Sequence, residues 1–268
     1  MCTLTIVPGS GALPSTLFRV VVNRDEQRSR CEALPPVVRR FGAYDAILPI
    51  DPPSQGTWIG VNSAGVVLGL LNANPVERRP KPIGTRSRGD IIPKLLGAGD
   101  VRSAMSALLE LDAREYPPFR LVAVEAGRIA VAAADGLQIT VQSFRSLDQP
   151  FIATSSGLGD HLVEWPRRDL FLEIMTSGLS AFEAQDAFHR HSWPDCRHLS
   201  VEMSRPDART VSRSVVEVGT DSVRLTYRSL SNQPAASSVV RARYTVAERS
   251  TTNADRGIFA SSRTRTTA

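Results

Sequence analysis

Cys2 is the residue of this 268-residue chain best suited to covalent chemistry. It follows Met1, and its small side chain favours removal of that methionine, which would make Cys2 the N-terminal residue. It would then carry a thiol with a pKa near about 8.5 and an α-amine with a pKa of roughly 7.7 to 8.0. Such a residue is a nucleophile with its own general base. Small residues also occur at position 2 by chance, so this hypothesis needs support from the rest of the chain.

A charged run at residues 23–26 (Asn-Arg-Asp-Glu) is expected to lie beside this N-terminus. Residues 2–7 and 17–23 each predict a strand, and the turn-forming Pro-Gly-Ser-Gly at 8–11 predicts that they pair as a hairpin. If the second strand continues, Asn23 and Asp25 share one face and Arg24 takes the other.

These positions suggest roles for two charged side chains. Asp25 would hold and orient the α-amine, and Arg24 or a later arginine would stabilise the thiolate. The alternative for Asp25 and Arg24 is a surface ion pair at a turn.

A second hairpin is predicted from residues 56–61 and 66–72, with a turn between them. Residues 66–71 are continuously apolar, which is typical of a strand buried on both faces. Asn72 ends this strand and offers an amide donor for a developing oxyanion. It would otherwise serve only as a cap or turn residue. Trp58, in the first strand of the pair, is interpreted as core packing.

The remaining pattern predicts an α+β protein with two sheets and helices outside them. Residues 27–53 are expected to form a proline- and arginine-rich loop, and Asp100 is a plausible helix cap. We expect helices at 88–96, 100–111, 160–176 and 181–191, and further strands at 119–125, 129–134, 137–144, 152–154, 199–203, 210–218 and 223–228. One domain is thus predicted over residues 1–230, followed by a disordered tail at 231–268.

Composition excludes several classes of protein. Hydrophobic residues make up 42% and charged residues 22% of the chain, as in ordinary globular proteins. No apolar run is long enough to span a membrane, and no secretory signal is recognisable, so we expect a cytoplasmic protein without a membrane partner. The three cysteines form no C-x-x-C pair, which favours a reducing compartment.

The net charge of +5 belongs mostly to the tail, which has six arginines against two acidic residues. A nucleic-acid-binding function would therefore depend on the tail alone, and we expect no nucleic-acid partner. A rival metal site of His189, His191, Cys196 and His198 matches no standard zinc spacing. We predict no metal and no cofactor.

Four short motifs resemble those of one known family. In order they are Met1-Cys2-Thr3, Asn23-Arg24-Asp25-Glu26, Gly56-Thr57-Trp58-Ile59-Gly60 and Ser87-Arg88-Gly89. Together they resemble the NRDE family, also called the transport and Golgi organisation protein 2 family. The resemblance covers residues 1–96 well, residues 150–218 loosely and the tail not at all.

That family is in turn similar to N-terminal nucleophile hydrolases, in particular the cysteine branch with bile salt hydrolases and penicillin V acylase. The resemblance implies a four-layer αββα fold, with Cys2 as nucleophile and Asn72 in the oxyanion hole. It also implies a site arginine at Arg209. Two departures stand out: Arg24 directly precedes Asp25, whereas the hydrolase branch has its arginine three residues earlier, and Thr154-Ser155-Ser156 lacks an asparagine common in relatives.

The leading hypothesis is hydrolysis of a C–N amide bond in a small molecule through an acyl-thioester, with removal of Met1 as the only maturation expected. The alternative is a non-catalytic haem or lipid carrier that uses the same cleft. The pattern does not predict the substrate or the oligomeric state.

Overall fold

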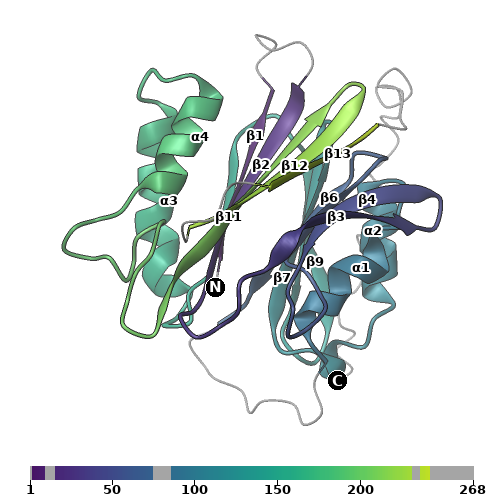
Figure 1. Cartoon of the computed structure of the whole chain (residues 1–268), viewed down its shortest axis with the longest axis horizontal. Coiled ribbons are helices and arrows are strands. Elements are labelled where there is room, and N and C mark those ends of the chain that lie inside the picture. The colour runs from purple at the N-terminus through teal and green to yellow at the C-terminus, as the bar shows by residue number, and fades with distance from the viewer. Residues whose placement is uncertain (1, 10–15, 75–85, 231–235, 242–268) are drawn as a thin grey trace, which may run out of the picture.

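The computed structural model describes residues 2–9, 16–74, 86–230 and 236–241. Two antiparallel sheets lie face to face, and a pair of helices covers the outer face of each (Figure 1). The result is a four-layer αββα sandwich, as predicted.

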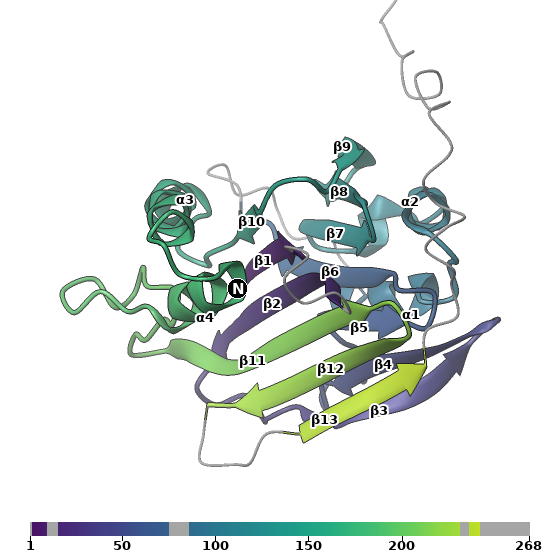
Figure 2. The same cartoon turned by 90° about the horizontal axis from the view of Figure 1, so that it is seen from above.

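The first sheet contains Cys2 at the start of β1. Its strand order is β10-β1-β2-β11-β12-β13 (Figure 2). The strands are β1 (Cys2–Pro8), β2 (Thr16–Gln27), β10 (Phe151–Thr154), β11 (Ala208–Gly219), β12 (Ser222–Ser229) and β13 (Ala236–Arg241). The predicted β1–β2 hairpin is confirmed.

The second sheet has the order β3-β4-β5-β6-β7-β8-β9. Its strands are β3 (Leu34–Phe41), β4 (Tyr44–Ile50), β5 (Ile59–Asn62), β6 (Val67–Asn72), β7 (Phe119–Glu125), β8 (Arg128–Ala134) and β9 (Ile139–Ser146). Every residue of β6 before Asn72 is buried. This confirms the two-sided burial predicted from its continuous apolar run.

The helices form two pairs on opposite sides of the sandwich. The second sheet is covered by α1 (Ile91–Leu95) and α2 (Val101–Leu109), and the first by α3 (His161–Met175) and α4 (Ala181–Arg190). Two short 3-10 helices are η1 (Arg88–Asp90) and η2 (Ala113–Glu115). Asp100 caps α2 as predicted, because its carboxylate accepts a hydrogen bond from the Ser103 N–H at 2.6 Å.

The core between the sheets sets the position of β1. The side chains of Cys2, Leu4 and Ile6 all lie in this apolar cluster. Gly69 in β6 lies directly beneath Leu4, since a Cβ atom there would be 2.3 Å from Leu4 Cδ1. Because Gly69 has no side chain, β1 packs closely against β6, the strand that ends in Asn72.

The loop predicted for residues 27–53 is wrong in part, because β3 and β4 lie within it. Pro35, Pro36, Arg39 and Arg40, which contributed to the loop prediction, are on β3, an edge strand. An edge strand tolerates proline, which has no N–H to donate to a neighbour. A register shift between Leu34 and Val37 spans the two prolines.

The strand predicted at 199–203 is also wrong. Its alternating apolar side chains do enter the core, with Val201 packed among Phe171 and Phe188. However, the carbonyls of Leu199 and Ser200 accept hydrogen bonds from the Arg167 side chain rather than from a neighbouring strand.

Part of the predicted disordered tail is ordered, because Ala236–Arg241 forms β13 against β12. Strand pairing uses main-chain hydrogen bonds, so it does not require large apolar residues. The remainder of the predicted tail, residues 231–235 and 242–268, lies outside the described residues.

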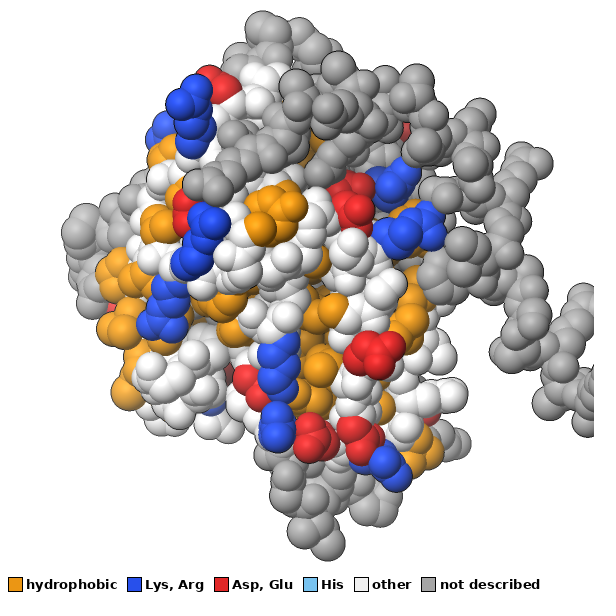
Figure 3. All heavy atoms as spheres, turned by 90° about the vertical axis from the view of Figure 1, so that its right-hand side faces the viewer, with side chains coloured by type: hydrophobic (Ala, Val, Ile, Leu, Met, Phe, Trp, Pro, Cys, Tyr) orange, Lys and Arg blue, Asp and Glu red, His pale blue; other side chains and the backbone are white. Residues whose placement is uncertain are grey.

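Charges of both signs are interspersed on the side of the molecule that carries α1 and α2 (Figure 3). None of the helices in the described ranges is both long and apolar enough to cross a membrane.

Candidate active site

Cys2 is held in place through its main chain. The Cys2 N–H donates to Ser155 Oγ at 3.1 Å, and the Cys2 carbonyl accepts from the Ser155 N–H at 2.9 Å. Ser155 directly follows β10, which pairs with β1. The thiol itself is buried, with Cys2 5% exposed, and it lines a cleft between the two sheets.

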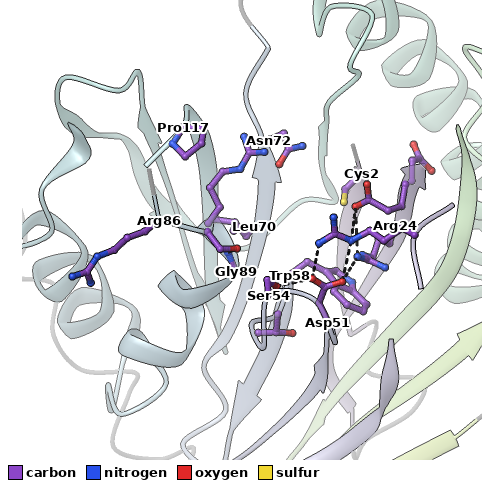
Figure 4. Close-up of a pocket in the computed structure, with 16 residues that line it drawn as sticks. Cys2, Arg24, Asp51, Ser54, Trp58, Leu70, Asn72, Arg86, Gly89 and Pro117 are labelled. Atoms are coloured by element: carbon purple, nitrogen blue, oxygen red, sulfur yellow. Dashed lines mark hydrogen bonds and ion pairs between the residues drawn. The ribbon is translucent and has the colours of Figure 1, made fainter. Parts of the chain in front are cut away.

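Arg24 is the residue of β2 directly opposite Cys2. Side chains at paired positions project from the same face of a sheet, so Arg24 and Cys2 enter the cleft together (Figure 4). The Arg24 guanidinium carbon lies 4.4 Å from the Trp58 ring centre, a cation–π contact. Trp58 therefore belongs to the core, as predicted, and also to the cleft wall.

Asp51 fixes the Arg24 guanidinium from the second-sheet side. Its carboxylate accepts hydrogen bonds from Arg24 Nη2 at 2.8 Å, Arg30 Nη2 at 2.6 Å and Ser54 Oγ at 2.6 Å. Burial acts to raise the pKa of Asp51, but the hydrogen bonds from Arg30 and Ser54 and the charge of Arg24 outweigh it and lower that pKa. Asp51 thus stays ionised and holds Arg24 beside the thiol.

Asp25 is buried on the opposite face of β2 from Arg24. Thr210 Oγ1 donates to its Oδ1 at 2.6 Å. Asn23 shares that face, since its amide donates to the His189 carbonyl under α4. The predicted division of the run 23–26 between two faces is therefore confirmed. Burial raises the pKa of Asp25, and the positive charge of Arg167 opposes the shift.

Arg167 braces the strands behind the nucleophile. It is 1% exposed, and its Nη1 donates to Thr3 Oγ1 at 2.7 Å and to Thr154 Oγ1 at 2.9 Å. These bonds join β1 to β10 next to Cys2. Arg167 was not predicted as part of the site, although its spacing offered a signal. It lies four residues from both Val163 and Phe171 on the buried face of α3.

Burial dominates the acidity of the nucleophile. Burial and the carboxylates of Asp25 and Glu26 raise the pKa of the Cys2 thiol, and the positive charge of Arg24 opposes them. A raised pKa leaves a smaller share of the thiol as thiolate near neutral pH. Use of the thiol as a nucleophile therefore calls for a nearby base.

Asn72 lies at the end of β6 on the second-sheet side of the same cleft (Figure 4). The cleft has a volume of about 290 Å³. Charged and polar side chains dominate its lining: Cys2, Arg24, Asp25, Glu26, Arg30, Asp51, Ser54, Thr57, Trp58, Leu70, Asn72, Arg86, Ser87, Arg88, Gly89 and Pro117.

Two of the four sequence motifs pack backbone to backbone to form one wall. The Thr57 N–H donates to the Gly89 carbonyl at 2.9 Å. A Cβ atom on Gly56 would lie 2.4 Å from that carbonyl oxygen, so only glycine permits the contact. The packing brings Arg88 and Trp58 to the same cleft.

The structure therefore brings together four of the five predicted site residues: Cys2, Arg24, Asp25 and Asn72. It does not bring Arg209 to the cleft lining. Arg209 pairs with Glu26 near the end of β2, and its neighbour Thr210 contacts Asp25. Ser155 and Asp51 were not predicted, because each contacts the site from a distant part of the chain.

The four residues of the rival metal site are not gathered at one point. His189 lies on the buried face of α4, and its Nε2 is 2.7 Å from Thr5 Oγ1. Cys196 is exposed in the loop that follows α4. Within the described residues, no group of three or more His, Cys, Asp or Glu side chains is placed to hold a metal ion.

The fold is shared with solved enzyme structures. A mutant of the conjugated bile acid hydrolase from Clostridium perfringens matches 91% of this chain and 97% of its own, with a TM-score of 0.51 and 12% identity. The Caenorhabditis elegans ortholog of N-acylethanolamine-hydrolyzing acid amidase matches 80% of this chain and 92% of its own, with a TM-score of 0.51 and 13% identity. The fold is thus that of the N-terminal nucleophile hydrolases.

A family profile gives a narrower assignment. The profile described as Transport and Golgi organisation 2 matches residues 1–217. The chain belongs to this family. No curated protein matches the sequence.

Proposed function

We propose that this protein is a cysteine N-terminal nucleophile hydrolase that cleaves a C–N amide bond of a small molecule. The observation that carries the proposal is the setting of Cys2. Its thiol faces a polar cleft opposite Arg24, and its main-chain nitrogen lies within hydrogen-bond distance of Ser155 Oγ. Removal of Met1 would turn that nitrogen into an α-amine on the same residue as the thiol.

The reaction would begin with transfer of the thiol proton to this α-amine as Cys2 Sγ attacks the amide carbonyl carbon. Asn72, which lines the same cleft, would donate its side-chain amide to the resulting oxyanion. The α-ammonium then returns a proton to the leaving amine, and the C–N bond breaks to give an acyl-thioester. A water molecule deprotonated by the α-amine hydrolyses this intermediate and restores the thiol.

Two neighbouring charges would support these steps. Asp25 would hold the α-ammonium, and Arg24 would stabilise negative charge on sulfur. Because burial raises the pKa of the thiol, the α-amine is the essential partner in this scheme.

The carrier alternative would use the same cleft for haem or a lipid. A cleft lined mainly by charged and polar side chains gives no specific support to an apolar cargo. A haem titration with absorbance spectroscopy separates the alternatives, because a stoichiometric shift that depends on Cys or His would favour the carrier.

The proposal is tested by the intact mass of the purified protein, followed by limiting alkylation near pH 7 with peptide mapping. We expect Met1 to be absent and Cys2 to be labelled before the exposed Cys31 and Cys196. A panel of small amides would then be hydrolysed by the wild type, and Cys2→Ala and Cys2→Ser should abolish turnover without loss of the fold. Retention of Met1, or turnover by either variant, would overturn the proposal.

A further inference from the structure

The cleft contains buried hydrogen-bond donors that no described residue satisfies. Arg24 Nη1 and Trp58 Nε1 are both fully buried and have no hydrogen-bond partner within the described part of the chain. Both side chains line the cleft, and Arg24 is only 5% exposed. An unpaired buried donor is energetically unfavourable. A ligand with acceptor atoms would remove this cost once a small movement of either side chain exposed its N–H.

Most arginines near the cleft already have partners. Arg30 binds Asp51 at 2.6 Å, and Arg86 lies 3.3 Å from Glu115. Arg28 donates to Ser204 Oγ and to the Arg205 carbonyl, and Arg40 pairs with Asp45 at 3.0 Å. These contacts leave one lining arginine to consider.

Arg88 is that residue. Within the described residues it forms no ion pair, and its Nη1 donates to the main-chain carbonyl of Pro118 at 2.9 Å. It is half-buried at η1, on the wall built by the contact between Thr57 and Gly89. A guanidinium has five N–H donors, so this single contact leaves most of them available.

No described carboxylate of the lining forms an ion pair with Arg88, although burial lowers the pKa of Arg88 and the negative charge of Glu26 acts to raise it. Asp51 accepts from Arg24, Arg30 and Ser54, and Glu26 lies 3.5 Å from Arg24 and 3.7 Å from Arg30. Asp25 accepts from Thr210 on the other face of β2. The part of the cleft beside Arg88 is therefore suited to a negatively charged group.

We propose that the substrate of this cleft carries an anionic group such as a carboxylate, and that Arg88 binds this group within reach of Cys2. The inference rests on the proposed function in treating the cleft as the substrate site. A planar guanidinium pairs with carboxylate or phosphate through two parallel hydrogen bonds. At about 290 Å³ the cleft suits a small amide with one charged end.

The test uses Cys2 as a reporter and does not require amide turnover. The full-length protein is alkylated with iodoacetate, which is anionic, or with iodoacetamide, which is neutral and of similar size. Peptide mapping by mass spectrometry gives the rate at each cysteine, with the exposed Cys31 and Cys196 as internal references. The measured quantity is the iodoacetate-to-iodoacetamide rate ratio at Cys2 relative to the reference thiols.

We expect this relative ratio to exceed one in the wild type and to fall about 10-fold or more in Arg88→Gln, the loss expected for one charge-assisted hydrogen bond. Arg40→Gln is the control, because Arg40 lies outside the cleft lining and pairs with Asp45 at the surface, and it should change the ratio less than twofold. Arg88→Lys keeps the charge but loses the paired N–H donors, so its ratio should fall between those of the wild type and Arg88→Gln. A wild-type ratio of one or below, or no decrease in Arg88→Gln, would overturn the inference.

A competition experiment keeps the inference testable if Arg88→Gln fails to fold. Acetate, succinate and inorganic phosphate are each compared with acetamide as protectants of wild-type Cys2 against iodoacetamide. Protection by an anion and not by acetamide supports the inference, and the most effective anion identifies the preferred group. Equal effects of anions and acetamide would contradict it. Both measurements compare reagents or protectants at the same thiol and do not require amide turnover. Anion selectivity at Cys2 without hydrolysis of any amide would support this inference while the hydrolase mechanism failed.

Discussion

Arg24 lies directly opposite Cys2 in the β1–β2 hairpin, and Asp51 holds its guanidinium from the other sheet. The ion pair of Arg24 and Asp51 therefore connects the two sheets at the cleft. This register also explains how an arginine placed immediately before Asp25 can face the thiol. Successive residues of β2 project to opposite faces, so the Arg24 side chain points toward the thiol, while the Asp25 carboxylate accepts from Thr210 and also borders the cleft.

Ser155→Ala should slow turnover of an amide substrate about 3- to 10-fold. The variant loses the hydroxyl that positions the nitrogen of Cys2, which is worth about one hydrogen bond. The main-chain bond from the Ser155 N–H to the Cys2 carbonyl remains, so the strand should keep its place. Steady-state kinetics tests the effect, and Ser155→Thr, which retains a hydroxyl, should lose less. Equal rates for Ser155→Ala and the wild type would exclude this positioning role.

Asn72→Ala should reduce kcat about 100- to 1000-fold with a smaller change in KM, as expected for removal of one oxyanion donor. Asn74→Ala is a suitable control. Asn74 lies two residues further along, where its side chain contacts Asp160 in a neighbouring pocket. The two variants are compared by steady-state kinetics on the same amide. Similar losses in both would show that Asn72 acts through the local structure and not on the oxyanion.

Local patterns were sufficient to predict much of the fold. The hairpin of β1 and β2, the buried run of β6 and the cap of α2 all depend on residues close together in the sequence. β3 was missed because prolines and arginines indicate loops unless a strand is known to lie at a sheet edge. The residues at 199–203 were misassigned because alternation indicates which side chains are buried but not what the main chain binds. The Arg167 side chain, rather than a neighbouring strand, donates to two of their carbonyls.

Only site residues that lie in short motifs or at strand ends could be predicted from the sequence. Cys2, Arg24, Asp25 and Asn72 fall in short motifs or at strand ends, and all four line the cleft. Ser155 and Asp51 act through pairings between distant segments, which no local pattern encodes. Arg88 lies within a motif, yet its lack of an acidic partner among the described residues becomes visible only in three dimensions.

Asp25→Asn should reduce amide turnover at least about 100-fold, since an amide cannot hold the α-ammonium by charge. Burial raises the pKa of Asp25 in the folded protein, so its contribution to stability is present below the unfolded pKa of about 3.9. That contribution is lost as pH rises through the folded pKa. Asparagine keeps an oxygen for Thr210 Oγ1 and does not titrate. The variant should therefore gain stability relative to the wild type as the pH rises from about 4 through the folded pKa of Asp25.

Urea unfolding of both proteins at several pH values measures this difference. A difference in the free energy of unfolding that stays constant with pH would contradict the raised pKa of Asp25. Loss of turnover together with the expected stability trend would separate the chemical role of the carboxylate from its effect on folding.

Asp51→Asn should lower the free energy of unfolding by about 1 to 3 kcal/mol at pH 7, because Arg24 and Arg30 lose a buried ionic acceptor. The pKa of Asp51 is lowered in the folded protein. Its stabilising contribution is therefore present above the unfolded pKa of about 3.9 and is lost as pH falls through the folded pKa. The difference between the variant and the wild type should shrink on acidification below about pH 4.

Urea unfolding from pH 7 to pH 3 measures this difference, with Asp45→Asn as the control. Asp45 pairs with Arg40 at the surface, so its loss should cost about 1 kcal/mol or less. A loss from Asp51→Asn that matches this control, or that persists unchanged at pH 3, would show that Asp51 does not anchor the Arg24 side chain as an ionised group.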